Sequence, residues 1–100
     1  MRVVWSPTAR RRAQAAVDYI ARDRPNTSLE WFDGLVRRVE FLRDLPEQGR
    51  VVPEWHEPSV REVLHEPYRI IYEVFDDRVE VLTLSHFRQQ LASEPPGGSL

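Results

Sequence analysis

The sequence contains no cysteine and no lysine. Without cysteine there can be no disulfide and no thiolate metal site, and this absence mildly favours the cytosol. All 14 basic residues are arginine, so no lysine amine can act as a proton donor or acceptor in catalysis. No apolar run approaches the ~18 residues of a membrane span, and the N-terminus lacks the apolar segment of a secretory signal. We therefore expect a cytoplasmic protein with no membrane partner.

The charges are nearly balanced. Acidic residues outnumber arginines by 16 to 14, so the formal net charge is −2, and no global field attracts nucleic acid. A chain of 100 residues, 41% of them hydrophobic, can form one domain with its own core. We assign residues 1–92 to that domain. The remaining segment, residues 93–100 with the sequence SEPPGGSL, is expected to be disordered.

Two amphipathic helices are predicted in the N-terminal half. Ser6 followed by Pro7 is a helix-start signal, and Pro25 interrupts the helical pattern. Residues 26–28 offer caps for a second helix, which Pro46 ends. Because the connection is short, the two helices should form an antiparallel hairpin. Their apolar stripes are Ala9, Ala13, Ala16, Val17 and Ile20, then Phe32, Leu35, Val36, Val39, Leu42 and Leu45.

Residues 60–88 read as three consecutive antiparallel strands, preceded by an irregular loop and, at residues 2–5, by a short β-like run. A two-residue turn at residues 76–77 would set the register of the last two strands. A three-residue turn at residues 66–68 would place Val60 and Leu64 on the core face. The predicted cross-strand pairs of the core face are Val74 with Val79, Tyr72 with Val81, and Ile70 with Thr83.

These elements predict an α+β fold, with an antiparallel sheet of about four strands and the N-terminal helical hairpin packed on one face. We expect Val17, Ile20, Phe32, Val39 and Tyr72 to carry the packing of the hairpin on the sheet. The opposite sheet face mixes basic and apolar side chains, and it is the candidate partner-binding face. Its predicted binding residues are Arg61, Arg69, Ile71, Leu82, Leu84 and His86.

Several short motifs occur in a characteristic order. They are Trp5-Ser6-Pro7, then Leu42, Leu45, Pro46, Gly49 and Arg50, then Arg61, Tyr68-Arg69-Ile70-Ile71-Tyr72 and His86. Together they resemble the RelE/ParE superfamily, the toxin halves of bacterial toxin–antitoxin modules. The resemblance implies a cognate antitoxin as partner, and it implies no cofactor, metal or small-molecule substrate.

Two activities compete within that superfamily. RelE-like members are ribosome-dependent mRNA endonucleases, whereas ParE-like members poison DNA gyrase. The chain looks closer to ParE, because it has no lysine, carries Phe87 where nucleases use a tyrosine, and is slightly acidic. A third reading is a family member that only binds the antitoxin and is not toxic.

The nuclease alternative would use Arg61, Arg69 and His86 as catalytic residues. By that resemblance, Arg69 would stabilise the scissile phosphate, and His86 would protonate the leaving oxygen. The simpler interpretations are structural: an ion pair of Arg69 with an acidic neighbour, an ion pair of Arg61 with Glu73, and a hydrogen-bonded histidine. Glu73 should also face Glu80, which requires an intervening arginine such as Arg61 or Arg78.

Overall fold

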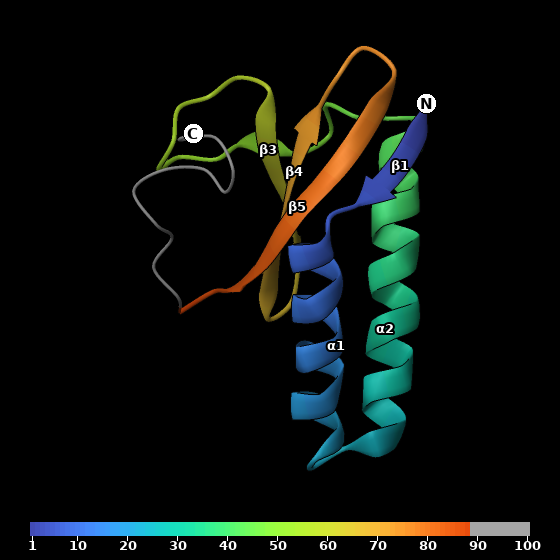
Figure 1. Ribbon diagram of the computed structural model, residues 1–100. Coiled ribbons are helices and arrows are strands. Elements are labelled where there is room, and N and C mark those ends of the chain that lie inside the picture. Colours follow the sequence, from blue (N-terminus) through green and yellow to red (C-terminus); the bar gives the residue numbers. More distant parts are fainter. Residues whose placement is uncertain (89–100) are drawn as a thin grey trace.

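The structure, a computed structural model that describes residues 1–88, is an α+β fold with a helical hairpin beside one mixed sheet (Figure 1). The order of the five strands in this part of the chain is β1-β5-β4-β3-β2. β1 (Arg2–Trp5) runs parallel to β5 (Arg78–His86), and the remaining neighbours are antiparallel. The predicted fold class is confirmed, with β2 as a short additional edge strand. The remaining strands are β2 (Arg50–Val51), β3 (Val60–His65) and β4 (Tyr68–Val74).

The first helix, α1 (Pro7–Ala21), begins where the sequence predicts. The hydroxyl of Ser6 accepts a hydrogen bond from the Ala9 N–H at 3.0 Å and donates one to the Leu82 carbonyl at 2.7 Å. Ser6 therefore caps the helix and also ties its start to β5. Neither helix in residues 1–88 is long and apolar enough to cross a bilayer. The expected disordered tail, residues 93–100, lies outside the described residues.

The second helix, α2 (Pro25–Glu40), starts with proline at its first position and continues into a 3-10 turn, η1 (Phe41–Arg43). Its N-cap residue is Arg24, without a side-chain cap. The prediction that residues 26–28 cap this helix was therefore wrong. The hydroxyl of Ser28 instead donates to the Pro25 carbonyl inside the first turn, at 2.6 Å.

The helices pack on one face of the sheet through small and branched side chains. Val39 and Tyr72 are fully buried, as predicted, whereas Val17 and Ile20 are only half-buried. Phe32 is 42% exposed, so its predicted place in the core was wrong. The buried stripe of α2 runs through Leu35 and Val39 instead. The buried hydrophobic core between the helices and the sheet comprises Ala9, Ala13, Leu35, Val39, Leu42, Val63, Ile70, Tyr72, Val79, Val81 and Leu84.

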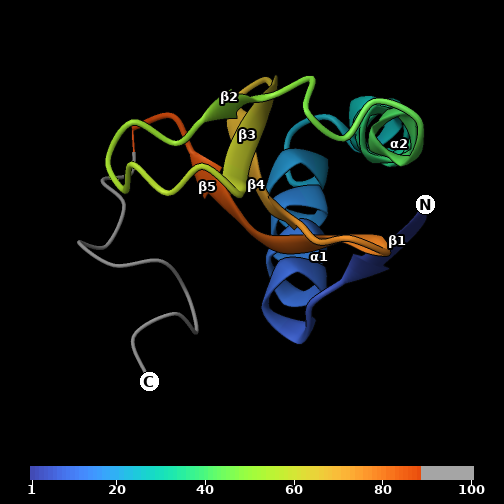
Figure 2. The same ribbon diagram turned by 90° about the horizontal axis from the view of Figure 1, so that it is seen from above.

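The opposite face of the sheet is covered by the loop at residues 52–59, on the side away from the helices (Figure 2). Val52 and Trp55 of this loop pack on Ile71 and Leu82 of the sheet. Residues that were expected to form an open binding face are thus partly under a loop. We call this side of the sheet the outer face.

A bulge changes the predicted register of the last two strands. Val74 pairs with Val79 and Tyr72 with Val81, as predicted, but Ile70 pairs with Leu84 and not with Thr83. The register shifts between Ile71 and Tyr72, so β5 contributes one more residue than β4 over this stretch. Leu84 therefore turns into the core beneath the helices, and its predicted place on the outer face was wrong.

The β3–β4 connection is one residue shorter than predicted. His65 pairs with Tyr68 and Val63 with Ile70, which leaves two residues in the turn. Because successive side chains of a strand point to opposite faces, a shift of one residue inverts the whole strand. Val63 accordingly lies in the core under the helices and Val60 on the outer face, the reverse of the prediction.

Candidate partner-binding site

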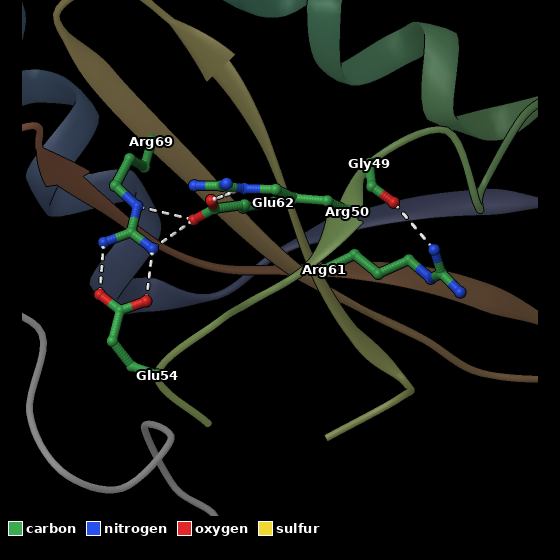
Figure 3. A network of polar contacts seen from close by, with 6 residues as sticks. All are labelled: Gly49, Arg50, Glu54, Arg61, Glu62 and Arg69. Carbon is green, nitrogen blue, oxygen red and sulfur yellow. Dashed lines mark hydrogen bonds and ion pairs between the residues drawn. The ribbon is translucent and has the colours of Figure 1, made fainter. Parts of the chain in front are cut away.

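Four charged residues form a cluster on the outer face, which we call the arginine–glutamate cluster: Arg50, Glu54, Glu62 and Arg69 (Figure 3). Its centre is Glu62 on β3, whose side chain is 1% exposed. The Nε of Arg50 donates to its Oε2 at 2.6 Å, and the Nε of Arg69 donates to its Oε1 at 2.6 Å. A buried carboxylate is costly unless it is paired on both sides, and these two arginines meet that requirement.

The two terminal nitrogens of the Arg69 guanidinium point toward Glu54, and we call the edge that they form the outer side of Arg69. Its two terminal nitrogens donate to the two Glu54 carboxylate oxygens, each at 2.8 Å (Figure 3). This parallel pair of bonds is the bidentate geometry that suits arginine and a carboxylate. The side chain of Arg69 is 11% exposed and that of Glu54 37%. The guanidinium is thus enclosed by one buried and one accessible carboxylate.

The pairing changes the acidity of both partners. Hydrogen bonds from Arg69 hold the pKa of the Glu54 carboxyl below its ordinary value, although burial opposes this. Hydrogen bonds to Glu54 raise the pKa of the Arg69 guanidinium, again against the effect of burial. Both groups therefore carry their full charge at neutral pH.

A hollow of about 360 Å³ opens beside this cluster. It is lined by Arg50, Glu54, Leu64, Arg69 and Phe87. Leu64 is 48% exposed and Phe87 42%, so the rim of the hollow is apolar. The site therefore offers charged and apolar side chains next to each other around one hollow.

The structure does not bring the predicted site residues onto one face. Arg69, Ile71 and Leu82 belong to the outer face, whereas Arg61 and Leu84 belong to the face that carries the helices. The prediction of a single binding face was wrong because of the two register changes. The individual roles predicted for these residues stay predictions.

Arg61 anchors the chain before β2. One terminal nitrogen donates to the Gly49 carbonyl at 2.8 Å (Figure 3). The same nitrogen also donates to the Glu47 carbonyl at 3.4 Å. Val60, not Arg61, stands opposite Glu73, so the predicted Arg61–Glu73 ion pair was wrong. Arg61 therefore holds backbone in place.

Glu73 and Glu80 face each other across β4 and β5, as predicted. The Nε of Arg78 lies 3.6 Å from the Glu80 carboxylate. Arg78 is thus the arginine that offsets the repulsion between the two carboxylates.

His86 lies at the end of a row of aromatic rings. Its ring meets Tyr68 edge-on, with 5.4 Å between centroids, and Tyr68 in turn meets Trp31 of α2 at 5.4 Å. Its Nδ1 accepts a hydrogen bond from the Arg88 N–H at 3.1 Å. This row continues to His65, whose ring centroid is 5.1 Å from that of Trp31. His86 is thus held on the helix side of the sheet, away from the arginine–glutamate cluster.

Sequence reasoning missed the two partners of Arg69. Glu62 lies on β3 between Arg61 and Val63, and a two-residue turn would have placed it on the same face of the sheet as Arg69. That signal was available in the sequence. Glu54 lies in an irregular loop, and no local pattern indicates its partner. Among residues 1–88, no group of three or more acidic or histidine side chains could hold a metal ion.

A second hollow, of about 290 Å³, lies beside the helical hairpin. It is lined by Trp5, Arg10, Ala13, Gln14, Phe32 and Val36. Phe32 and Val36 are 42% and 38% exposed. We call it the hairpin groove, and it places exposed apolar side chains next to the positive charge of Arg10.

Comparison with known proteins first defines the class of fold. A solved structure described as "Chromosomal ParDE TA system from P. aeruginosa" matches with a TM-score of 0.73 and 22% sequence identity, over 86% of this chain and 95% of that chain. At this identity the likeness shows the fold alone. A search of curated proteins found no match.

The family follows from the sequence. The family described as "ParE toxin of type II toxin-antitoxin system, parDE" matches residues 3–91. The chain therefore belongs to the ParE toxin family.

Proposed function

We propose that the protein is a toxin that is neutralised by a cognate antitoxin and acts by binding DNA gyrase, without chemistry of its own. Its membership of the ParE family supports this proposal. The observation that favours it over mRNA cleavage is the separation of Arg69 from Arg61 and His86, which lie on the other side of the sheet.

A ribonuclease must bring its phosphate-binding and proton-transferring groups to the same phosphate. Here Arg69 already donates to the carboxylates of Glu54 and Glu62. Arg61 donates to backbone carbonyls, and His86 packs on Tyr68. The three candidates therefore do not form one catalytic constellation.

Two surfaces are suited to the antitoxin. The hairpin groove exposes Phe32 and Val36 beside Arg10, which fits the apolar face of an amphipathic segment that carries an acidic residue. The arginine–glutamate cluster, with its apolar rim, is the second surface. Both lie outside the main core, so a partner can cover them without unfolding the domain.

The decisive experiment compares the two possible targets in parallel. The purified protein should inhibit supercoiling by DNA gyrase, and it should leave mRNA on ribosomes intact. Replacing His86 by Ala, or Arg69 by Lys, which keeps a positive charge opposite the buried Glu62, should reduce toxicity only modestly, with Glu57→Gln as a surface control. Ribosome-dependent cleavage that Arg69→Ala lowers by ~10³-fold or more would overturn the proposal and establish the nuclease alternative.

The non-toxic alternative has its own signature. A chain that only binds the antitoxin would form the complex but would change neither supercoiling nor transcripts. Growth after induction would then match that of an uninduced culture, and the gyrase proposal would be wrong.

A further inference from the structure

The two carboxylates around Arg69 differ in character. Glu62 is 1% exposed and accepts hydrogen bonds from both arginines of the cluster. Glu54 is 37% exposed, and Arg69 is the side chain within residues 1–88 that donates hydrogen bonds to its carboxylate. Glu62 is therefore a permanent counterion, and Glu54 is a replaceable one.

Because Glu54 is partly exposed, a rotation of its side chain toward solvent would release the guanidinium. The backbone on either side is held by Val52 and Trp55, which pack on the sheet. After the rotation, Arg50, Glu62 and Arg69 remain, and their formal charges sum to +1. Two N–H donors of Arg69 would then be free beside the 360 Å³ hollow.

We propose that the outer side of Arg69 is a seat for an acidic side chain of a protein partner, which displaces Glu54 and forms the same bidentate pair. The proposed function supplies the antitoxin as that partner, and this part of the inference rests on it. Glu54 itself demonstrates the fit, since both of its oxygens lie 2.8 Å from the guanidinium nitrogens. An Asp or Glu carboxylate has the planar shape that this geometry selects.

The surroundings favour a protein partner over nucleic acid. The rim is apolar, with Leu64 and Phe87 exposed, and it suits an acidic residue flanked by hydrophobic ones. The chain carries a net charge of −2, which repels a polyanion. Arg50 provides one further cation at the hollow, with 66% of its side chain exposed.

In this arrangement Glu54 acts as an internal competitor. A partner must bind Arg69 better than Glu54 does, so isolated acids bind weakly and a segment with additional apolar contacts binds well. Neutralising Glu54 should therefore raise the affinity of the seat for any carboxylate.

The first test uses a small carboxylate. Sodium acetate is titrated into the full chain at constant ionic strength, and the Nε–H resonance of Arg69 is followed by NMR. Glu54→Gln should bind acetate about tenfold more tightly than the wild type, because the competitor has lost its charge. Glu57→Gln, in the same loop but without an arginine partner among residues 1–88, serves as the matched control and should behave as the wild type.

Two results of this titration would contradict the proposal that Arg69 binds a partner's carboxylate. One is equal acetate affinity in Glu54→Gln and wild type. The other is tighter binding of inorganic phosphate than of acetate by Glu54→Gln, which would assign the seat to a phosphate ligand.

The second test uses the complex with the antitoxin that the proposed function implies, identified as the product of a gene adjacent to the gene of this protein. Arg69→Lys keeps a positive charge opposite Glu62 but cannot donate a planar fork, so the complex should dissociate at least about tenfold faster. Glu54→Gln should slow dissociation. Wild-type dissociation rates in both variants, with melting temperatures unchanged, would show that the partner does not use the seat. If the wild-type chain forms no complex at all, the proposed function fails, and the acetate titration still decides whether the seat exists.

Discussion

Gly49 lies where the chain before β2 passes close to the backbone of β3. A Cβ added there would lie 2.4 Å from the Glu62 carbonyl oxygen and 2.6 Å from the Tyr72 hydroxyl. The Gly49 N–H also donates to that hydroxyl at 2.9 Å. Glycine is therefore required by this close approach, which explains one of the residues that carry the family resemblance.

Replacing Gly49 by Ala should lower the free energy of unfolding by at least about 1–3 kcal/mol, because the added methyl group clashes with the backbone of β3. Urea denaturation measures the loss. Tyr72→Phe should itself cost about 1–3 kcal/mol, since it leaves the buried N–H of Gly49 without an acceptor. The double variant should lose less than the sum, because phenylalanine removes one of the two clashes. Strict additivity would contradict this account.

The ion pair of Glu54 predicts a specific dependence of stability on pH. The ordinary pKa of this carboxyl is 4.5, and the folded protein lowers it. A lowered pKa stabilises the folded state above the unfolded value, and the stabilisation is lost as pH falls through the folded pKa. Wild-type stability should therefore fall more steeply below about pH 4.5 than that of Glu54→Gln.

The measurement is the free energy of unfolding in urea as a function of pH. Glu57→Gln should follow the wild type, since Glu57 has no arginine partner in the described part of the chain. If the curves of Glu54→Gln and wild type run parallel down to pH ~3, the ion pair of Glu54 with Arg69 does not stabilise the folded state.

At the scale of the elements, α2 divides its apolar residues between two surfaces. Leu35, Val39 and, beyond the helix, Leu42 are fully buried against the sheet. Phe32 and Val36 are displaced around the helix and face the hairpin groove with α1. The apolar stripe of this helix is therefore wider than the core needs, and the surplus forms exposed surface.

Matched substitutions on α2 test this division. Val39→Asp should lower the free energy of unfolding by several kcal/mol, because it buries an unpaired charge. Phe32→Asp should cost less than about 1 kcal/mol, since the side chain is already partly in solvent. Thermal melts of both variants give the comparison. Equal losses would mean that Phe32 belongs to the core after all.

At the scale of the whole molecule, residues 1–88 leave apolar surface exposed in the hairpin groove and at the rim of the arginine–glutamate cluster. Exposed apolar patches beside charges are typical of protein interaction sites. The proposed function assigns them to the antitoxin.

Co-expression with the protein encoded next to this chain should therefore give a stable complex and restore growth. Gel filtration should show a single co-eluting species, and Phe32→Asp should weaken it while the toxin stays folded. Separate elution together with persistent toxicity would show that the pairing is wrong.

The sequence alone determined the features that depend on near neighbours in the chain. Ser6 and Pro7 start α1 because capping and a fixed φ are local properties. The pairs Val74–Val79 and Tyr72–Val81 follow from a tight turn and a period of two. The ordered motifs also sufficed to indicate the superfamily, and the family match confirms it.

Only the tertiary structure decided the faces of β3 and of the end of β5, and with them the site. The position of a bulge and the length of a turn depend on packing across the whole sheet, and a single-residue difference inverts every side chain beyond it. The same reason explains why Arg69 meets Glu62 and Glu54, while Arg61 and His86 lie on the opposite side. The contact of Arg69 with Glu54 joins a strand to an irregular loop 15 residues away, so it arises from the fold as a whole and the local pattern carries no record of it.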